Sequence, residues 1–160
     1  MASVTVAYTT TKTVTCTITS LANSATVGRE STVVSNSTVK YLDAQVVLKA
    51  ELSTGTAAND KAVYVYAYGG STTLYTGGNL TGADAASTMR NPTSLRLIGV
   101  CPTPTAGLDY IAGPFSVANA FGGVLPPRWG VFVRNYSGVA LTANSTGNFL
   151  EYHGVTATVV

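Results

Sequence analysis

Charged side chains are scarce in this chain of 160 residues: 10% are Asp, Glu, Lys or Arg, and the formal net charge is only +2. Because no cluster of Lys or Arg concentrates this weak charge, the sequence lacks the electrostatic footprint of a nucleic-acid-binding protein. It also lacks a run of about 20 continuous apolar residues, the length that a membrane-spanning helix needs. Residues 1–21 show no basic start followed by an apolar segment, so we recognise no secretory signal. We expect synthesis in a cytoplasm and neither nucleic acid nor a membrane as partner.

Residues that carry catalysis are equally sparse. His153 is the single histidine, which excludes a His-rich metal site, and a Ser-His-Asp triad would have to recruit it. The sequence contains neither a Gly-x-Ser-x-Gly nucleophile elbow nor a phosphate-binding glycine loop. Its seven acidic residues form no local pair of the kind that glycosidases use. We therefore expect no enzyme activity, no cofactor and no metal. A hydrolase, one opposing hypothesis, needs His153 beside a nucleophile and a carboxylate.

Cysteine is also rare, since the chain has only Cys16 and Cys101, far apart in the sequence. A disulfide between them is one reading. Two buried free thiols are the reading that the sequence favours, because a protein made in the cytoplasm keeps its cysteines reduced and buries them as small apolar side chains.

Alternating hydroxyl and apolar residues are what the sequence has in abundance. Thr13–Thr19 alternates Thr with Val, Cys and Ile without interruption. A period of two is typical of a β-strand with one buried face and one face in water. The same pattern and the positions of turn-forming residues predict these strands: Ser3–Thr9, Thr13–Thr19, Thr38–Leu52, Ala62–Tyr68, Ser94–Val100, Phe115–Ala118, Trp129–Asn135 and Glu151–Val160.

The fold class follows from these strands. Helical periodicity is nearly absent, and only Asp84–Arg90 suggests a short turn of helix. The sequence predicts an all-β protein, an antiparallel two-sheet sandwich, and the uneven spacing of the strands favours the jelly-roll type. We expect one sandwich domain over residues 20–160. Residues 1–19 carry one or two further strands, which form either an edge of that sandwich or an arm that contacts another subunit.

The alternation also predicts which side chains fill the core. Thr13, Thr15 and Thr17 should be largely exposed or lie at a contact, because a slip of one residue would expose a whole apolar row. Trp129 is the expected anchor of the core, which turns Phe132 and Arg134 outward. The residues expected to be buried are Leu42, Val46, Leu48, Val63, Val65, Val131 and Val133.

Two segments suggest binding rather than catalysis. Tyr64, Tyr66 and Tyr68 line one face of a predicted strand whose other face is Val63, Val65 and Ala67, so both faces are apolar. Either a loop of the same chain covers the tyrosines, or they form a subunit contact. Ser20–Asn36 is read either as an ordinary surface loop or as a docking loop, in which Arg29, beside Glu30, is a bidentate donor to a partner carboxylate.

Several of these segments together resemble a family of small virion proteins of tailed bacteriophages. The resemblance covers most of the chain from Ser20 onward, and its motifs are structural. It implies a capsid cement or decoration protein with a jelly-roll body, made in the host cytoplasm and bound to the outer surface of the virion's assembled head. The residues that carry it are Ser20–Ser24, Gly28–Thr32, Tyr41–Ala44, Asn59–Gly69 and Trp129–Gly138.

The expected function is therefore structural. The chain would form a dimer or trimer and bridge subunits of the major capsid protein, held by apolar and hydrogen-bonded contacts. The alternative is a module of a phage tail or fibre that recognises host carbohydrate, with the tyrosine row open to solvent. The candidate contact residues are Arg29, Glu30, Tyr64, Tyr66, Tyr68, Phe132 and Arg134.

Overall fold

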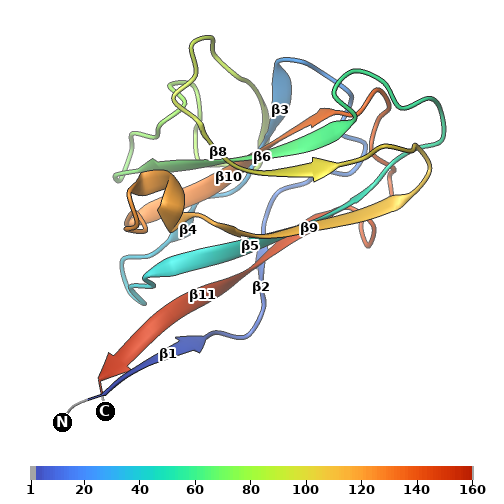
Figure 1. Ribbon diagram of the computed structural model, residues 1–160. Coiled ribbons are helices and arrows are strands. Elements are labelled where there is room, and N and C mark those ends of the chain that lie inside the picture. Colours follow the sequence, from blue (N-terminus) through green and yellow to red (C-terminus); the bar gives the residue numbers. More distant parts are fainter. Residues whose placement is uncertain (1–2, 160) are drawn as a thin grey trace.

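Two antiparallel sheets packed face to face make up the protein, as seen in a computed structural model that describes residues 3–159 (Figure 1). Sheet A contains β1 (Val4–Tyr8), β2 (Lys12–Val14), β5 (Asp43–Glu51), β9 (Asp109–Ser116) and β11 (Phe149–Val159). Sheet B contains β3 (Val27–Glu30), β4 (Val34–Ser35), β6 (Ala62–Gly70), β7 (Ala85–Thr88), β8 (Arg96–Pro102) and β10 (Arg128–Tyr136). A short 3-10 helix, η1 (Ala118–Phe121), precedes β10. The predicted all-β, two-sheet sandwich is confirmed.

The order of strands places the longest ones in the middle of each sheet. In sheet A the order is β1-β11-β5-β9, and β2 pairs with β11 on the same side as β1. In sheet B the order is β7-β3-β10-β6-β8, and β4 pairs with β10 beside β3. On one side of the sandwich the edge strands are β8 and β9, which lie next to each other in Figure 1, and at the opposite edges stand β7 in sheet B and β1 and β2 in sheet A.

The core lies between the sheets and follows the predicted alternation. Along β5 every second residue is buried, including Val46 and Leu48. Trp129 is fully buried on β10, and its ring meets that of Tyr152 on β11 edge to face, with 5.1 Å between centroids. Because one ring comes from each sheet, this pair joins the two layers. The remaining inward residues are also buried as predicted: Val63, Val65, Val131 and Val133.

One predicted core residue is exposed. Leu42 is 53% exposed, and its neighbour Tyr41 is buried in its place. The reason is a backbone clamp, because the side chain of Asn36 both donates to the carbonyl of Tyr41 and accepts from its N–H. Lys40, directly before Tyr41, has a left-handed backbone conformation with a φ of 56°. The chain therefore turns just before β5, and the apolar alternation of the strand begins only at Ala44.

Some strand boundaries also differ from the predictions. Thr13, Thr15 and Thr17 are exposed as expected, but β2 ends at Val14. The helical turn predicted within Asp84–Arg90 is wrong, since β7 forms there by pairing with β3. Ser20–Asn36 is likewise not only a loop, because it contains β3 and β4. Met1, Ala2 and Val160, at the ends of the predicted arm and of the last predicted strand, lie outside the described residues.

The two cysteines are buried and unbridged, as the sequence favoured. Burial raises the pKa of both thiols, that of Cys101 to about 11. Both thiols therefore stay protonated at neutral pH, and neither is a nucleophile.

Candidate interaction surface

The outer face of sheet B gathers most of the predicted contact residues. Val63, Val65 and Ala67 of β6 fill the core, so the tyrosines between them must point outward. The antiparallel register then places neighbours on the same face: Tyr64 lies beside Arg134 of β10 and Val100 of β8, and Tyr66 lies beside Phe132 and Leu97. The outer face thus carries rows of aromatic and aliphatic side chains, with Arg134 among them, that cross three strands.

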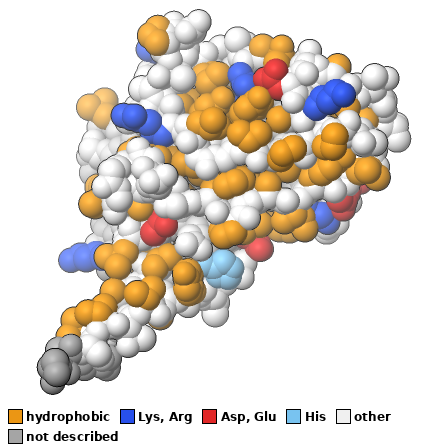
Figure 2. Space-filling model, viewed as in Figure 1, with side chains coloured by type: hydrophobic (Ala, Val, Ile, Leu, Met, Phe, Trp, Pro, Cys, Tyr) orange, Lys and Arg blue, Asp and Glu red, His pale blue; other side chains and the backbone are white. Residues whose placement is uncertain are grey.

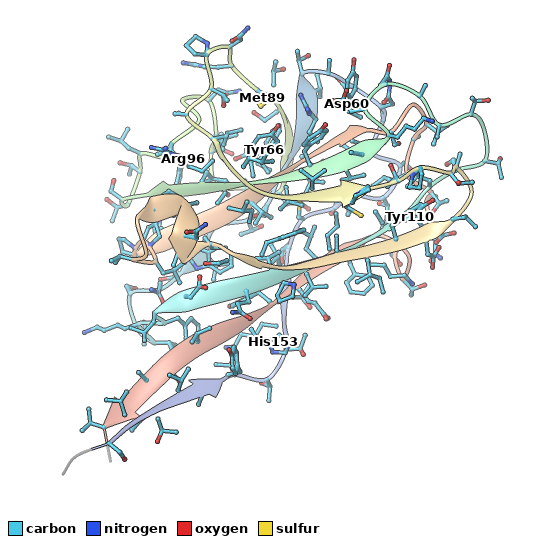
Figure 3. All side chains as sticks on the ribbon, in the orientation of Figure 1. Asp60, Tyr66, Met89, Arg96, Tyr110 and His153 are labelled. Carbon is cyan, nitrogen blue, oxygen red and sulfur yellow. The ribbon has the colours of Figure 1, made fainter. Side chains whose placement is uncertain are left out.

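One half of this face is covered by the chain itself. The connection from β6 to β8, residues 71–95, which we call the cover segment, packs over Tyr66, Tyr68 and Phe132. Figure 3 labels Tyr66 beside Met89, one of the covering residues. Tyr68 lies across Gly130, where an added Cβ atom would overlap the tyrosine ring, and its hydroxyl donates to the carbonyl of Ser31 at 2.6 Å.

A buried carboxylate holds the cover segment in place. Glu30 on β3 is 1% exposed and faces the turn of the cover segment. It accepts hydrogen bonds from the backbone N–H groups of Thr81 and Gly82, at 2.9 and 3.1 Å, and from the Thr81 hydroxyl at 3.0 Å. Glu30, Tyr68 and Phe132 were predicted as contact residues. In this structure the chain's own cover segment packs over these side chains and over Tyr66, which is 8% exposed.

Arg29 also binds within its own chain. Its guanidinium forms an ion pair with the Asp84 carboxylate, and its Nη2 donates to the Asp84 carbonyl at 2.9 Å. The predicted carboxylate partner of Arg29 is therefore internal. Burial alone would raise the pKa of Asp84, but hydrogen bonds from Arg29 and Thr17 outweigh it and lower that pKa below its usual value. This cluster ties β3 to the segment after β2 and to the middle of the cover segment, directly before β7.

The other half of the outer face is open. Arg134 stacks among three tyrosine rings, with its guanidinium carbon 4.4 Å from the centroid of Tyr64, 5.4 Å from that of Tyr136 and 6.0 Å from that of Tyr66. Its Nη1 donates to the carbonyl of Ala25 at 2.9 Å. Its Nε is buried and has no hydrogen-bond partner among residues 3–159. The guanidinium is therefore fixed by rings rather than by an ion pair.

Apolar side chains of the edge strand extend this half. Leu97 and Val100 on β8 are 52% and 39% exposed. The Tyr64 hydroxyl donates to Asp60 at 2.8 Å, and burial together with that bond raises the pKa of Tyr64. Figure 2 shows hydrophobic side chains gathered on this part of the surface, with basic and acidic groups among them. We call Tyr64, Leu97, Val100, Arg134 and Tyr136 the open surface.

Sequence reasoning found part of the open surface. Tyr64 and Arg134 were predicted from alternation within their strands. Leu97, Val100 and Tyr136 were missed, because what joins them to the site is the pairing of β8 with β6 and of β6 with β10. The sequence holds a weak signal for these three, which is that each lies within a strand or at its end.

No reactive cluster accompanies this surface. Nδ1 of His153 lies 2.9 Å from the carbonyl of Thr9, and Nε2 lies 3.4 Å from the hydroxyl of Thr11, so the imidazole tethers the link between β1 and β2. Within the described chain, no group of three or more His, Cys, Asp or Glu side chains is arranged to hold a metal. Residues 3–159 also contain no helix that is long and apolar enough to cross a membrane.

A second feature of sheet B is a surface hollow at the end of β10. The hollow, of about 410 Å³, is lined by four hydroxyl side chains, a proline and Arg128. Nη1 of Arg128 donates to the carbonyl of Thr72 at 2.8 Å and to the hydroxyl of Tyr75 at 3.1 Å. The other lining residues are Ser35, Ser37, Ser71, Thr72 and Pro127.

Comparisons with protein families, curated proteins and solved structures found no match to this chain. Arguments about its function therefore depend on the residues themselves and on the open surface.

Proposed function

We propose that this chain is a non-enzymatic capsid cement or decoration protein of a tailed bacteriophage, made in the host cytoplasm and bound to the outer surface of the head in the virion. In this proposal the open surface contacts the major capsid protein and bridges neighbouring subunits. The observation that carries the proposal is Arg134, held among three tyrosine rings on the uncovered half of a rigid sheet.

The composition of the open surface suits a protein partner. Tyr and Arg are the side chains most enriched among the residues that dominate binding energy at interfaces. Tyr64 and Arg134 stand on paired strands and hold each other in place, so binding orders few side chains and loses little conformational entropy. Leu97 and Val100 add apolar area that a partner would remove from water.

The strand order supports the jelly-roll type of sandwich. If β1, β4 and β7 are treated as additions, eight strands remain, in the orders β2-β11-β5-β9 and β3-β10-β6-β8. The links from β2 to β3, β5 to β6, β8 to β9, β9 to β10 and β10 to β11 all pass from one sheet to the other. Such crossings are typical of a jelly roll.

A cement protein acts through repetition. Each copy gains little from one contact, but a copy or a small oligomer that bridges several subunits leaves only when all its contacts break together. Tyr64 contacts both Asp60 and Arg134, so the open surface carries an acidic and a basic group and little net charge. Salt screens interactions between exposed charges over about 8–10 Å or less. We therefore expect attachment to the head to survive high salt.

Co-sedimentation with undecorated phage heads tests the proposal. The purified chain should bind at low salt and remain bound at molar salt. Arg134→Gln and Tyr64→Ala should each weaken binding about tenfold or more, because they remove the central anchors. Arg96→Gln is the matched control, since Arg96 is exposed on β8 but lies outside the open surface. Complete release in molar salt, or no binding to heads under any condition, would contradict the proposal.

The hollow beside Arg128 favours a second candidate, a tail or fibre module that binds host carbohydrate. Its hydroxyls and guanidinium are suitable partners for sugar hydroxyls or acidic sugars. Binding of the purified chain to immobilised host glycans, lost in Arg128→Gln but kept in Arg134→Gln, would support this candidate over cement. Binding to heads with the opposite dependence on the two arginines would support cement.

A further inference from the structure

A two-stranded ribbon extends from the sandwich at the chain ends. The pairing of β11 with β5 ends at Val155 opposite Asp43, whereas β11 itself continues to Val159. Beyond that point, within residues 3–159, it pairs with β1 alone, in the register Val4 with Val159 through Tyr8 with Val155. We call Val4–Tyr8 and Val155–Val159 the ribbon. Figure 1 shows it projecting away from the body, with both described chain ends at its tip.

The alternation of β11 changes face at Gly154. Before it, Leu150 and Tyr152 point into the core, as does Gly154 itself, while Glu151 and His153 point outward. After it, the inward positions are Thr156 and Thr158, and the apolar residues stand at the outward positions. A strand that merely continued past its sandwich into water would need no apolar row on its outer side. The inversion indicates that something beyond this chain's own core packs on that side.

The apolar row of the ribbon is complete across both strands. Cross-strand partners share a face, so Val4 and Val159, Val6 and Ala157, and Tyr8 and Val155 stand together. All five residues of β1 are exposed, and Val4, Val6, Tyr8 and Val159 are 66%, 57%, 62% and 68% exposed. Figure 2 shows hydrophobic side chains along the extension. The opposite face consists of Thr5, Ala7, Thr156 and Thr158.

The ribbon also lacks the devices that protect edge strands β8 and β9. Edge strand β8 has a register shift and ends at Pro102, and edge strand β9 has a register shift opposite β5 and contains Pro114. Proline, irregular register and charge are the usual means of preventing unwanted pairing at an edge. Val4–Tyr8 and Thr156–Val159 contain no proline and no charge, and their register is continuous.

We infer that the ribbon is a self-association surface, on which the apolar face of one copy packs against the same face of a second copy about a two-fold axis. The face carries no charge, so an identical face is complementary to it and buries no ion. Two exposed strands are at best marginally stable alone, and a pair of ribbons supplies four. With usual side-chain areas, the exposed part of the face is roughly 500 Å² per copy, and a symmetric pair buries at most roughly 1,000 Å², the lower bound for a specific interface.

This inference goes beyond head binding and stands without it, because every test uses the purified chain alone. Crosslinking locates the face. Val6 is the central residue of the β1 row, so it lies near the two-fold axis, and stacked sheets are about 10 Å apart. Val6→Cys treated with a bismaleimide of matching length should give a covalent dimer. Thr5→Cys, on the opposite face, should give none. Cys16 and Cys101 are buried, so they contribute little background.

Sedimentation equilibrium measures the affinity. The unmodified chain should sediment as a dimer, and the double variant Val6→Thr/Val159→Thr should weaken dimerisation about tenfold or more while its far-ultraviolet circular dichroism stays unchanged. Val124→Thr is the matched control, since Val124 is 72% exposed but lies outside the ribbon. A monomer at all concentrations, a different stoichiometry, or equal crosslinking of Thr5→Cys and Val6→Cys would overturn the inference. None of these outcomes would bear on whether the open surface binds heads.

Discussion

The covered half and the open half of the outer face of sheet B both carry outward-facing aromatic side chains, but they differ in solvent exposure. Tyr68 and Phe132 are fully buried under the cover segment, whereas Tyr64 and Arg134, a few positions along the same strands, remain partly exposed. The difference lies in residues 71–95 and not in the strands. A strand pattern therefore reports that a face is apolar, and another part of the chain decides whether that face becomes core or surface.

Phe132→Ala should produce the largest loss of stability on this face. Phe132 is 0% exposed and packs against Tyr66 edge to face, at 6.3 Å between centroids. Removing a buried phenylalanine leaves a cavity and should lower the free energy of unfolding by about 3–5 kcal/mol. Urea denaturation measures it. Val100→Ala on the open half is the comparison and should cost less than about 1 kcal/mol. Equal losses at the two positions would contradict the division into halves.

Glu30→Gln should detach the cover from the face. The carboxylate accepts three hydrogen bonds, two of them from backbone N–H groups, and an amide would present its own donors to the same groups. We expect a loss of about 1–3 kcal/mol and faster hydrogen exchange confined to residues 71–95. Glu151→Gln, on the outer side of β11, is the control and should leave exchange unchanged. Unaltered protection of the cover segment in Glu30→Gln would show that apolar contacts alone hold it.

The ion pair of Asp84 with Arg29 makes the rim of the covered half sensitive to acid. Because the folded-state pKa of Asp84 is lowered, the carboxylate stabilises the fold above its unfolded pKa of about 3.9, and this stabilisation is lost as pH falls through the lower folded pKa. Asp84→Asn should therefore cost about 1–2 kcal/mol at pH 7. The difference from the unmodified chain should shrink below about pH 4. Urea denaturation at pH 7 and pH 3 makes the test, and a gap that is the same at both would contradict it.

His153→Ala, outside both halves, should have the smallest effect, at most about 1 kcal/mol. In the described chain the imidazole forms hydrogen bonds only with the carbonyl of Thr9 and the hydroxyl of Thr11. Thermal denaturation measures the change in stability, and binding to heads should be unaffected. Loss of a hydrolytic activity in this variant would overturn the proposal that the protein is not an enzyme.

Alternation predicted the strand that faces the core with every second residue, as in β5. It failed where the state of a residue depends on distant parts of the chain. The residues of β3, Val27–Glu30, show no apolar alternation, and they form a strand because β10 and β7 pair with them on both sides. Leu42 fits the alternation but is exposed, since Asn36 turns the backbone before β5 begins.

The candidate site, like the fold, was predicted only in part, because alternation gives the direction of a side chain and not what distant parts of the chain cover it. The outward direction of Tyr64, Tyr66, Tyr68, Phe132 and Arg134 follows from their strands. Which of them are covered depends on where the cover segment lies, and residues 71–95 have no periodicity from which to predict that. Its position is determined by specific contacts such as those of Thr81 and Gly82 with Glu30.

Trp129 gives the protein a built-in optical reporter. It is the single tryptophan, is fully buried, and touches Tyr152 from the opposite sheet. Indole fluorescence shifts to longer wavelength when water reaches the ring, so its emission reports separation of the two layers. It lies on the core side of β10, away from the cover segment on the outer face. A variant that speeds hydrogen exchange in residues 71–95 without shifting this emission has therefore detached the cover segment from an intact sandwich. A fluorescence spectrum thus separates local opening from global unfolding.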